Sequence, residues 1–265
     1  MNAYWKLLNY EIDRFSRIYG AMAILTLLLQ SAAAAWLARS LVNRIRDGLI
    51  AGSGHSFTTF STNPLFLAPV ALCAAALILY VFLIWYRDWF GRHTFIYRLL
   101  LLPSSRMNVY WAKLSAIFLF VLGLIALQLA TLPLHLYTFQ AIVPEEYRTA
   151  ADVAAVIRKN DLFILLIPRY ASDYIFFYGL GLAGLIVAFT VILLERSYRI
   201  RGLIAGILYI LCVVFLLVTP SVIHEVYPYF FYFDELNWMT CVIGLLIVCG
   251  SLWLSSYLIR RKITV

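Results

Sequence analysis

The chain alternates between long apolar runs and shorter polar segments, and this alternation predicts its architecture. Each apolar run is roughly 20 residues long, enough for an α-helix to cross the ~30 Å hydrocarbon core of a bilayer. The predicted spans are residues 18–38, 66–86, 114–139, 174–194, 203–219 and 238–259. A transmembrane β-barrel would instead show short segments of alternating polarity. The pattern therefore predicts an all-α polytopic membrane protein, with residues 1–265 forming a single transmembrane domain.

Residues 1–17 precede the first span and are too polar to cross a membrane. Tyr4, Leu8 and Phe15 recur at helical spacing with charged residues between them, which predicts an amphipathic helix lying in the interface. A cleaved signal peptide is the competing interpretation. Acidic residues such as Glu11 argue against it, because the start of a signal peptide is basic.

Two of the connecting segments are expected to contain helices of their own. In residues 142–172, Pro144 and two glutamates provide helix start signals, and Arg158 and Lys159 provide a stop. This segment is predicted to be an extracellular loop with a short helix. The loop of residues 87–113 is predicted to contain a short amphipathic helix that ends before Pro103.

Composition and charge agree with a membrane protein and orient it. Hydrophobic residues make up 64% of the chain and charged residues 13%, whereas soluble domains carry about 25% charged residues. The net charge of +8 comes from Lys and Arg at the ends of the apolar runs, which fits the positive-inside rule better than a nucleic-acid groove. The side that holds both termini carries 14 Lys and Arg against 7 opposite. Both termini are therefore expected in the cytoplasm.

The cores of the predicted spans contain no Asp, Glu, Lys or Arg. Ion-coupled carriers and proton pumps usually hold such groups near the middle of the bilayer, where they bind the coupling ion. The energy source of a transporter with this sequence is therefore expected to lie outside the chain.

The remaining short motifs favour packing over chemistry. The sequence GLGLAG at residues 179–184 matches a dinucleotide fingerprint, but it lies inside a span without a preceding strand. Small residues there, and at Gly202 and Gly206, suggest close helix packing. No phosphate-binding loop of the G-x-x-x-x-G-K-[ST] type is present, and neither the four histidines nor the four cysteines have metal-site spacing. No catalytic or metal-binding residue is predicted.

Polar residues stand out inside two spans. Gln30 lies in the first span, and Gln128, Thr131 and His135 share one helical face of the third. The favoured interpretation is hydrogen bonding between helices. The alternative is that these four residues line a substrate path or the seam between two copies of the protein.

The loop between the second and third spans carries a recognisable pattern. It contains D-x-x-G-x-x-T from Asp88 to Thr94, then LLLLPSSR from Leu99 to Arg106, then Lys113 seven residues further on. This pattern and the six-span layout resemble the permeases of ABC-2 type transporters. In this sequence Asp88 stands where the family has Glu, and two residues separate Gly91 from Thr94.

The resemblance implies that the loop forms a coupling helix, which docks into a separate cytoplasmic ATPase subunit that binds ATP and Mg. The residues expected to contact the ATPase are Arg92, Thr94, Phe95, Tyr97 and Arg98. The chain itself would then be no enzyme. It would act in a bacterial cell membrane as a dimer, with itself or a related permease, and would export a hydrophobic, lipid-like or peptide cargo.

A membrane protein without an ATPase partner is the rival hypothesis, for example an immunity or sensor protein or an intramembrane enzyme. An intramembrane enzyme would need paired polar catalytic groups within the spans, and the sequence shows none. A gene for a P-loop ATPase beside this one would favour transport.

Overall fold

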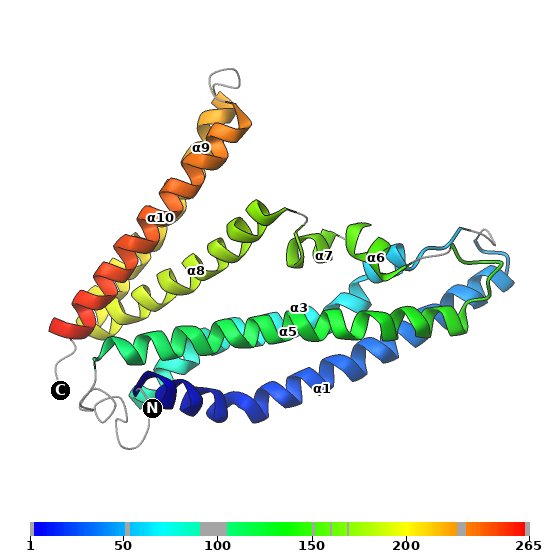
Figure 1. The fold of residues 1–265 in the computed structure, drawn as a ribbon, viewed down its shortest axis with the longest axis horizontal. Coiled ribbons are helices and arrows are strands. Elements are labelled where there is room, and N and C mark those ends of the chain that lie inside the picture. Colours follow the sequence, from blue (N-terminus) through cyan, green and yellow to red (C-terminus); the bar gives the residue numbers. More distant parts are fainter. Residues whose placement is uncertain are drawn as a thin grey trace. The chain divides into compact units, whose positions relative to one another are not determined.

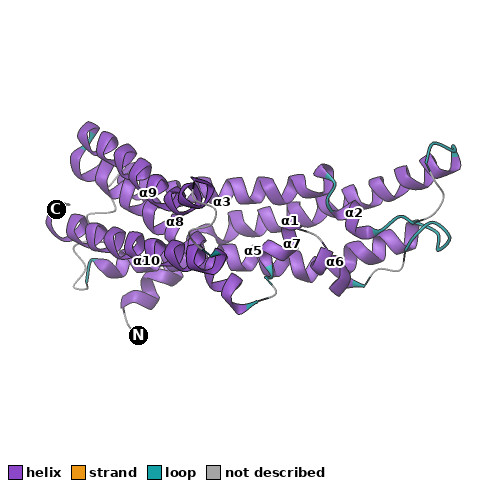
Figure 2. Cartoon of the chain, turned by 90° about the horizontal axis from the view of Figure 1, so that it is seen from above, coloured by secondary structure: helices purple, strands orange, loops and turns teal. Residues whose placement is uncertain are grey.

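The structure is a computed structural model, and it describes residues 3–50, 54–90, 105–149, 152–159, 161–168, 170–226 and 232–262. These residues form helices joined by loops and turns (Figure 2). The helices are α1 (Ala3–Arg46), α2 (Phe57–Ser61), α3 (Pro64–Phe90), α5 (Met107–Ile142), α6 (Val153–Lys159), α7 (Asp161–Leu166), α8 (Ala171–Tyr198), α9 (Ile200–Val226), α10 (Phe233–Tyr257) and the π-helical η1 (Leu258–Lys262) (Figure 1).

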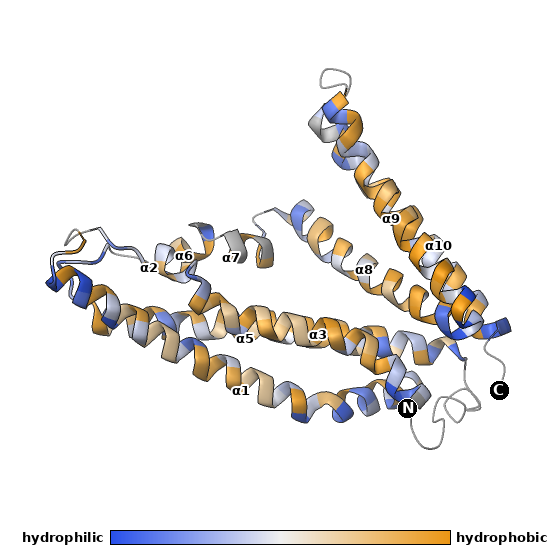
Figure 3. Ribbon diagram, turned by 180° about the vertical axis from the view of Figure 1, so that it is seen from behind, coloured by the Kyte–Doolittle hydropathy of each residue, from blue (hydrophilic) through white to orange (hydrophobic). Residues whose placement is uncertain are grey.

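Six of the described helices are long and apolar enough to cross a membrane, which confirms the predicted all-α polytopic class. Each predicted span lies within one of α1, α3, α5, α8 and α9, or within α10 together with η1. The helices extend beyond the apolar runs because their polar flanks continue the backbone hydrogen bonding. Coloured by hydropathy, α9 and α10 are apolar along most of their length and polar toward their ends (Figure 3).

α1 is one continuous helix of 44 residues. At 1.5 Å per residue it is about 66 Å long, more than the ~45 Å thickness of a bilayer with its headgroups. The structure has no break at residue 17, where the sequence suggested that an interfacial helix ends and a span begins. No proline interrupts α1, so nothing in its sequence forces a break. The location of residues 1–17 in the interface stays a prediction.

The segment of residues 142–172 contains two short helices, α6 and α7, where the sequence predicted one. The predicted start at Pro144 is a turn, closed by the Tyr147 N–H donating to the Pro144 carbonyl. α6 starts at Val153, where the Asp152 carboxylate accepts from the Val153 N–H at 2.7 Å. The predicted stop at Lys159 is the last residue of α6.

α8 and α9 are joined by Arg199, which has a φ of 54°. A Cβ at Gly202 would overlap the Leu194 carbonyl, and one at Gly206 would lie 3.0 Å from Val191 Cγ1. This agrees with the close packing predicted at these two glycines. The GLGLAG stretch of residues 179–184 differs, because a Cβ at any of its glycines would meet no described atom within 4 Å.

The chain divides into two compact units. Unit 1 comprises Met1–Tyr10, Leu79–Ala116 and Tyr174–Val265, and unit 2 comprises Glu11–Ile78 and Ile117–Asp173. The core of unit 2 gathers Phe57, Phe139 and Phe163 with aliphatic residues of α1, α5 and α6. In unit 1, the Phe189 ring packs edge-on against the rings of Trp85 and Tyr110, both at 5.4 Å.

Candidate functional site

The strongest concentration of polar chemistry in unit 1 is a buried ion pair between the end of α3 and the start of α5. Lys113 Nζ lies 2.5 Å from Asp88 Oδ2, and both side chains are fully buried. Lys113 also donates to the Ile84 carbonyl at 2.9 Å and lies 5.3 Å from the centre of the Trp85 ring. A lysine at the start of an apolar run is usually solvated, but the structure encloses Lys113 in protein.

Local sequence explains how these charges become buried. Ile84 and Asp88 are four residues apart and share one face of α3, where the Ile84 side chain is also fully buried. Tyr110 and Lys113 share the facing side of α5, three residues apart. A buried charge is tolerated only when it is paired and hydrogen-bonded. The pair meets that condition, and it therefore fixes the rotation of α3 relative to α5 in this region.

A second contact joins the end of α3 to the end of α8. The Tyr86 hydroxyl donates to the Glu195 carboxylate. The neighbouring Arg196 guanidinium lies 4.5 Å from the centre of the Tyr86 ring, in cation–π geometry. Arg196 also lies 3.9 Å from the Glu195 carboxylate. The last turn of α3 is therefore held from two sides, by α5 and by α8.

The start of α5 has two further contacts within unit 1. Arg106 Nη1 donates to the Ile259 carbonyl of η1 at 3.4 Å, and the Tyr4 hydroxyl donates to Ser115 Oγ at 2.9 Å. We call the five polar residues that tie α3, α5, α8 and η1 together the base cluster: Tyr86, Asp88, Arg106, Lys113 and Glu195.

Four members of the base cluster flank the segment that carries the predicted ATPase contacts, Tyr86 and Asp88 before it and Arg106 and Lys113 after it. Arg92, Thr94, Phe95, Tyr97 and Arg98 fall between α3 and α5 and outside the described residues. Their roles stay predictions. The structure shows that α3 and α5, the helices on either side of that segment, are joined by the Asp88–Lys113 ion pair.

The four polar residues predicted inside spans all lie buried in unit 2. Gln30 and Gln128 exchange two amide hydrogen bonds, each 3.1 Å long, between α1 and α5. Thr131 donates to the Gln128 carbonyl of its own helix at 3.2 Å, and the His135 ring packs edge-on against Phe66. For Gln30 and Gln128 the favoured interpretation, interhelical hydrogen bonding, is what the structure shows. A substrate path or a dimer seam stays a prediction.

The sequence indicates only part of the base cluster. Asp88 and Lys113 belong to the motif between the second and third spans, whereas no pattern marks Tyr86 or Glu195. The signal that could indicate these residues is a single charge at the end of an apolar run, as at Asp88, Lys113 and Glu195. Charges at such positions are usually solvated, so the signal is weak. The partner of each charge could not be predicted, because it depends on how the helices are rotated.

The base cluster pairs its charges and joins the ends of α3 and α5. Comparisons of the chain with protein-family models, with curated proteins and with solved structures find no match.

Proposed function

We propose that the chain is the membrane-spanning permease of an ABC transporter. The observation that carries the proposal is the buried Asp88–Lys113 pair, which joins the helices on either side of the coupling motif. Six helices of membrane-spanning length and composition support it. Motion transmitted into a membrane needs a rigid connection on the membrane side, and a fully buried ion pair supplies one.

In this proposal a separate cytoplasmic ATPase binds residues 91–104 and moves them as it binds and hydrolyses ATP. The ion pair makes α3 and α5 respond together, since leaving either charge buried without its partner costs about 3–5 kcal/mol. The Tyr86 contact with Glu195 passes the same motion to α8. Two permease copies, identical or related, form the path for a hydrophobic, lipid-like or peptide cargo that is exported. Both termini lie in the cytoplasm of a bacterial cell.

The proposal is tested by purifying the tagged full-length protein in mild detergent and identifying an ATPase that accompanies it. The double variant R92Q/R98Q removes two charges from the proposed contact, and we expect it to lower ATPase recovery about tenfold. The matched control is R39Q/R46Q, which removes two exposed arginines from the last turns of α1. Equal recovery with both variants, or wild-type protein that brings no ATPase, contradicts the proposal.

A further inference from the structure

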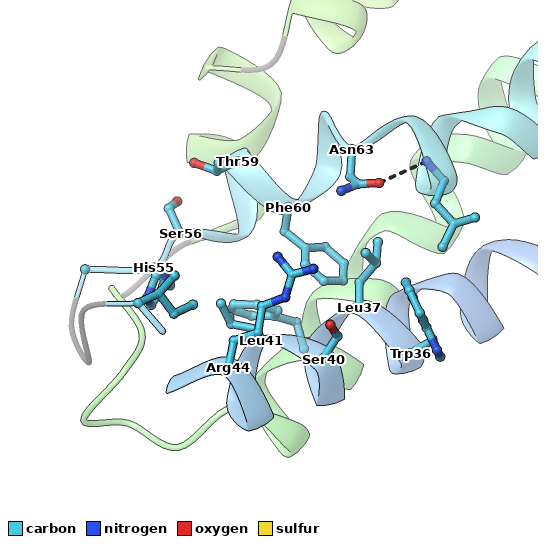
Figure 4. A pocket seen from close by; sticks show the side chains of 14 residues that line it. Trp36, Leu37, Ser40, Leu41, Arg44, His55, Ser56, Thr59, Phe60 and Asn63 are labelled. Carbon is cyan, nitrogen blue, oxygen red and sulfur yellow. Dashed lines mark hydrogen bonds between the residues drawn. The ribbon is translucent and has the colours of Figure 1, made fainter. Parts of the chain in front are cut away.

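Unit 2 contains a cavity of about 370 Å³ between the last turns of α1 and the start of α3 (Figure 4). Its walls come from α1, the loop before α2, α2 itself, the first residues of α3 and Phe139 of α5. Its size falls in the range of ligand sites, about 300–1,000 Å³. The lining mixes apolar side chains, such as Trp36 and Leu41, with polar ones, such as Arg44 and Asn63.

Arg44 supplies the charge of this cavity. Its guanidinium lies among the lining side chains in Figure 4, and it has no ion-pair or hydrogen-bond partner in the described part of the chain. No described lining residue is acidic. The Ser40 hydroxyl, one turn before Arg44 on α1, adds hydrogen-bonding capacity. Arg44 is exposed at the edge of the cavity. A cation without an acidic partner there is complementary to an anion.

The cavity follows α1 across the predicted end of the first span. That span ends at residue 38, so the prediction puts Trp36 within the apolar run and Arg44 beyond it. The two residues are about 12 Å apart along the helix axis. Tryptophan is a typical residue of the membrane interface. Trp36 and Leu65 are 60% and 46% exposed.

The walls of the cavity are fixed by hydrogen bonds. Ser56 Oγ accepts from the Thr58 N–H at 3.2 Å and starts α2, and His55 exchanges backbone hydrogen bonds with Tyr147 and Thr149. Asn63 Oδ1 accepts from the Leu65 N–H at 3.0 Å and starts α3 (Figure 4). These hydrogen bonds hold the lining residues at the starts of α2 and α3.

We propose that this cavity binds one anionic lipid. The headgroup phosphate accepts hydrogen bonds from the Arg44 guanidinium, and the first acyl carbons lie against Trp36 and Leu65. The site is independent of the proposed function, because it is formed by unit 2 alone and requires neither an ATPase nor transport. It belongs to the end of α1 remote from the N-terminus, so the expected topology places it on the outer side of the membrane.

The test is a lipid titration of the full-length protein in neutral detergent, followed by native mass spectrometry. We expect dioleoyl phosphatidylglycerol to bind at least about tenfold more tightly than dioleoyl phosphatidylcholine. R44Q should lose that preference, and R44K should keep most of it. R46Q is the matched control, since Arg46 is exposed, lies two residues away and is not part of the lining. W36A should weaken binding of phosphatidylglycerol, because acyl contact is lost.

Three results would overturn the proposal. The first is equal binding of the two lipids by the wild-type protein. The second is equal binding of phosphatidylglycerol by R44Q and R46Q. The third is displacement of phosphatidylglycerol by an equal concentration of glycerol phosphate, which would identify a soluble phosphate ester as the ligand.

Discussion

Replacing Lys113 by methionine is the most direct test of the base cluster. The change keeps an unbranched apolar stem but leaves the Asp88 carboxylate buried without its cation. Loss of one partner of a buried ion pair costs about 3–5 kcal/mol, because the remaining charge is neither solvated nor compensated. For a chain of this size about 1 kcal/mol shifts the unfolding midpoint by ~2–4 °C. We therefore expect K113M to lower the midpoint by about 6–20 °C.

The assay is the fraction of protein that stays monodisperse in mild detergent after heating, measured over a temperature series. D88N should give a loss of similar size, since it leaves an uncompensated ammonium. The double variant D88N/K113M should lose less than either single variant, because replacing both charges together is often neutral. K6M and D13N are the matched controls, because they make the same two substitutions at exposed positions of α1.

The reasoning fails if K113M and D88N shift the midpoint no more than K6M and D13N do. It also fails if the losses of the two single variants simply add in the double variant. Either result would mean that the two charges are not coupled, and the base cluster would then not be what joins α3 to α5.

Three other variants probe contacts elsewhere in the chain. Q128L leaves the Gln30 side-chain carbonyl buried without the donor from Gln128. It should therefore destabilise by about 1–2 kcal/mol in the same heating assay, and Q30L/Q128L by less. G202A places a methyl group against a backbone carbonyl of α8 and should lower the yield of folded protein, whereas G179A, which meets open space, should not. Y86F removes a hydrogen bond to a carboxylate of α8 and should cost about 1.5 kcal/mol. A neutral result for Q128L, G202A or Y86F would contradict the packing described for that residue.

The membrane spans could be predicted because one effect, the removal of apolar side chains from water, decides where they lie. An apolar run of this length has one stable place in a cell, and its backbone must satisfy its own hydrogen bonds there, so it forms a helix. The ends of the helices were harder to predict. The polar residues of 1–17 could lie in a separate helix or extend the first span, and the structure shows an unbroken α1.

The contacts between helices were predictable only where spacing along one helix constrained them. Gln128, Thr131 and His135 share a face of α5 by periodicity alone, and that face is buried. The Asp88–Lys113 pair could not be predicted in this way, because its residues lie on different helices and meet only through the rotation of both. Glycines show the same limit, since Gly202 lies against a neighbouring backbone while Gly179 meets open space.

The order in which the ion pair is synthesised has a consequence for biogenesis. Asp88 leaves the ribosome 25 residues before Lys113. At a synthesis rate of about 5–20 residues per second, Asp88 is present for roughly 1–5 s before Lys113 is added. During that interval a nascent chain displays a lone carboxylate at the end of its second hydrophobic helix, and a chain truncated before residue 113 displays it permanently. Unfinished chains thus expose a carboxylate that is buried in the full-length protein.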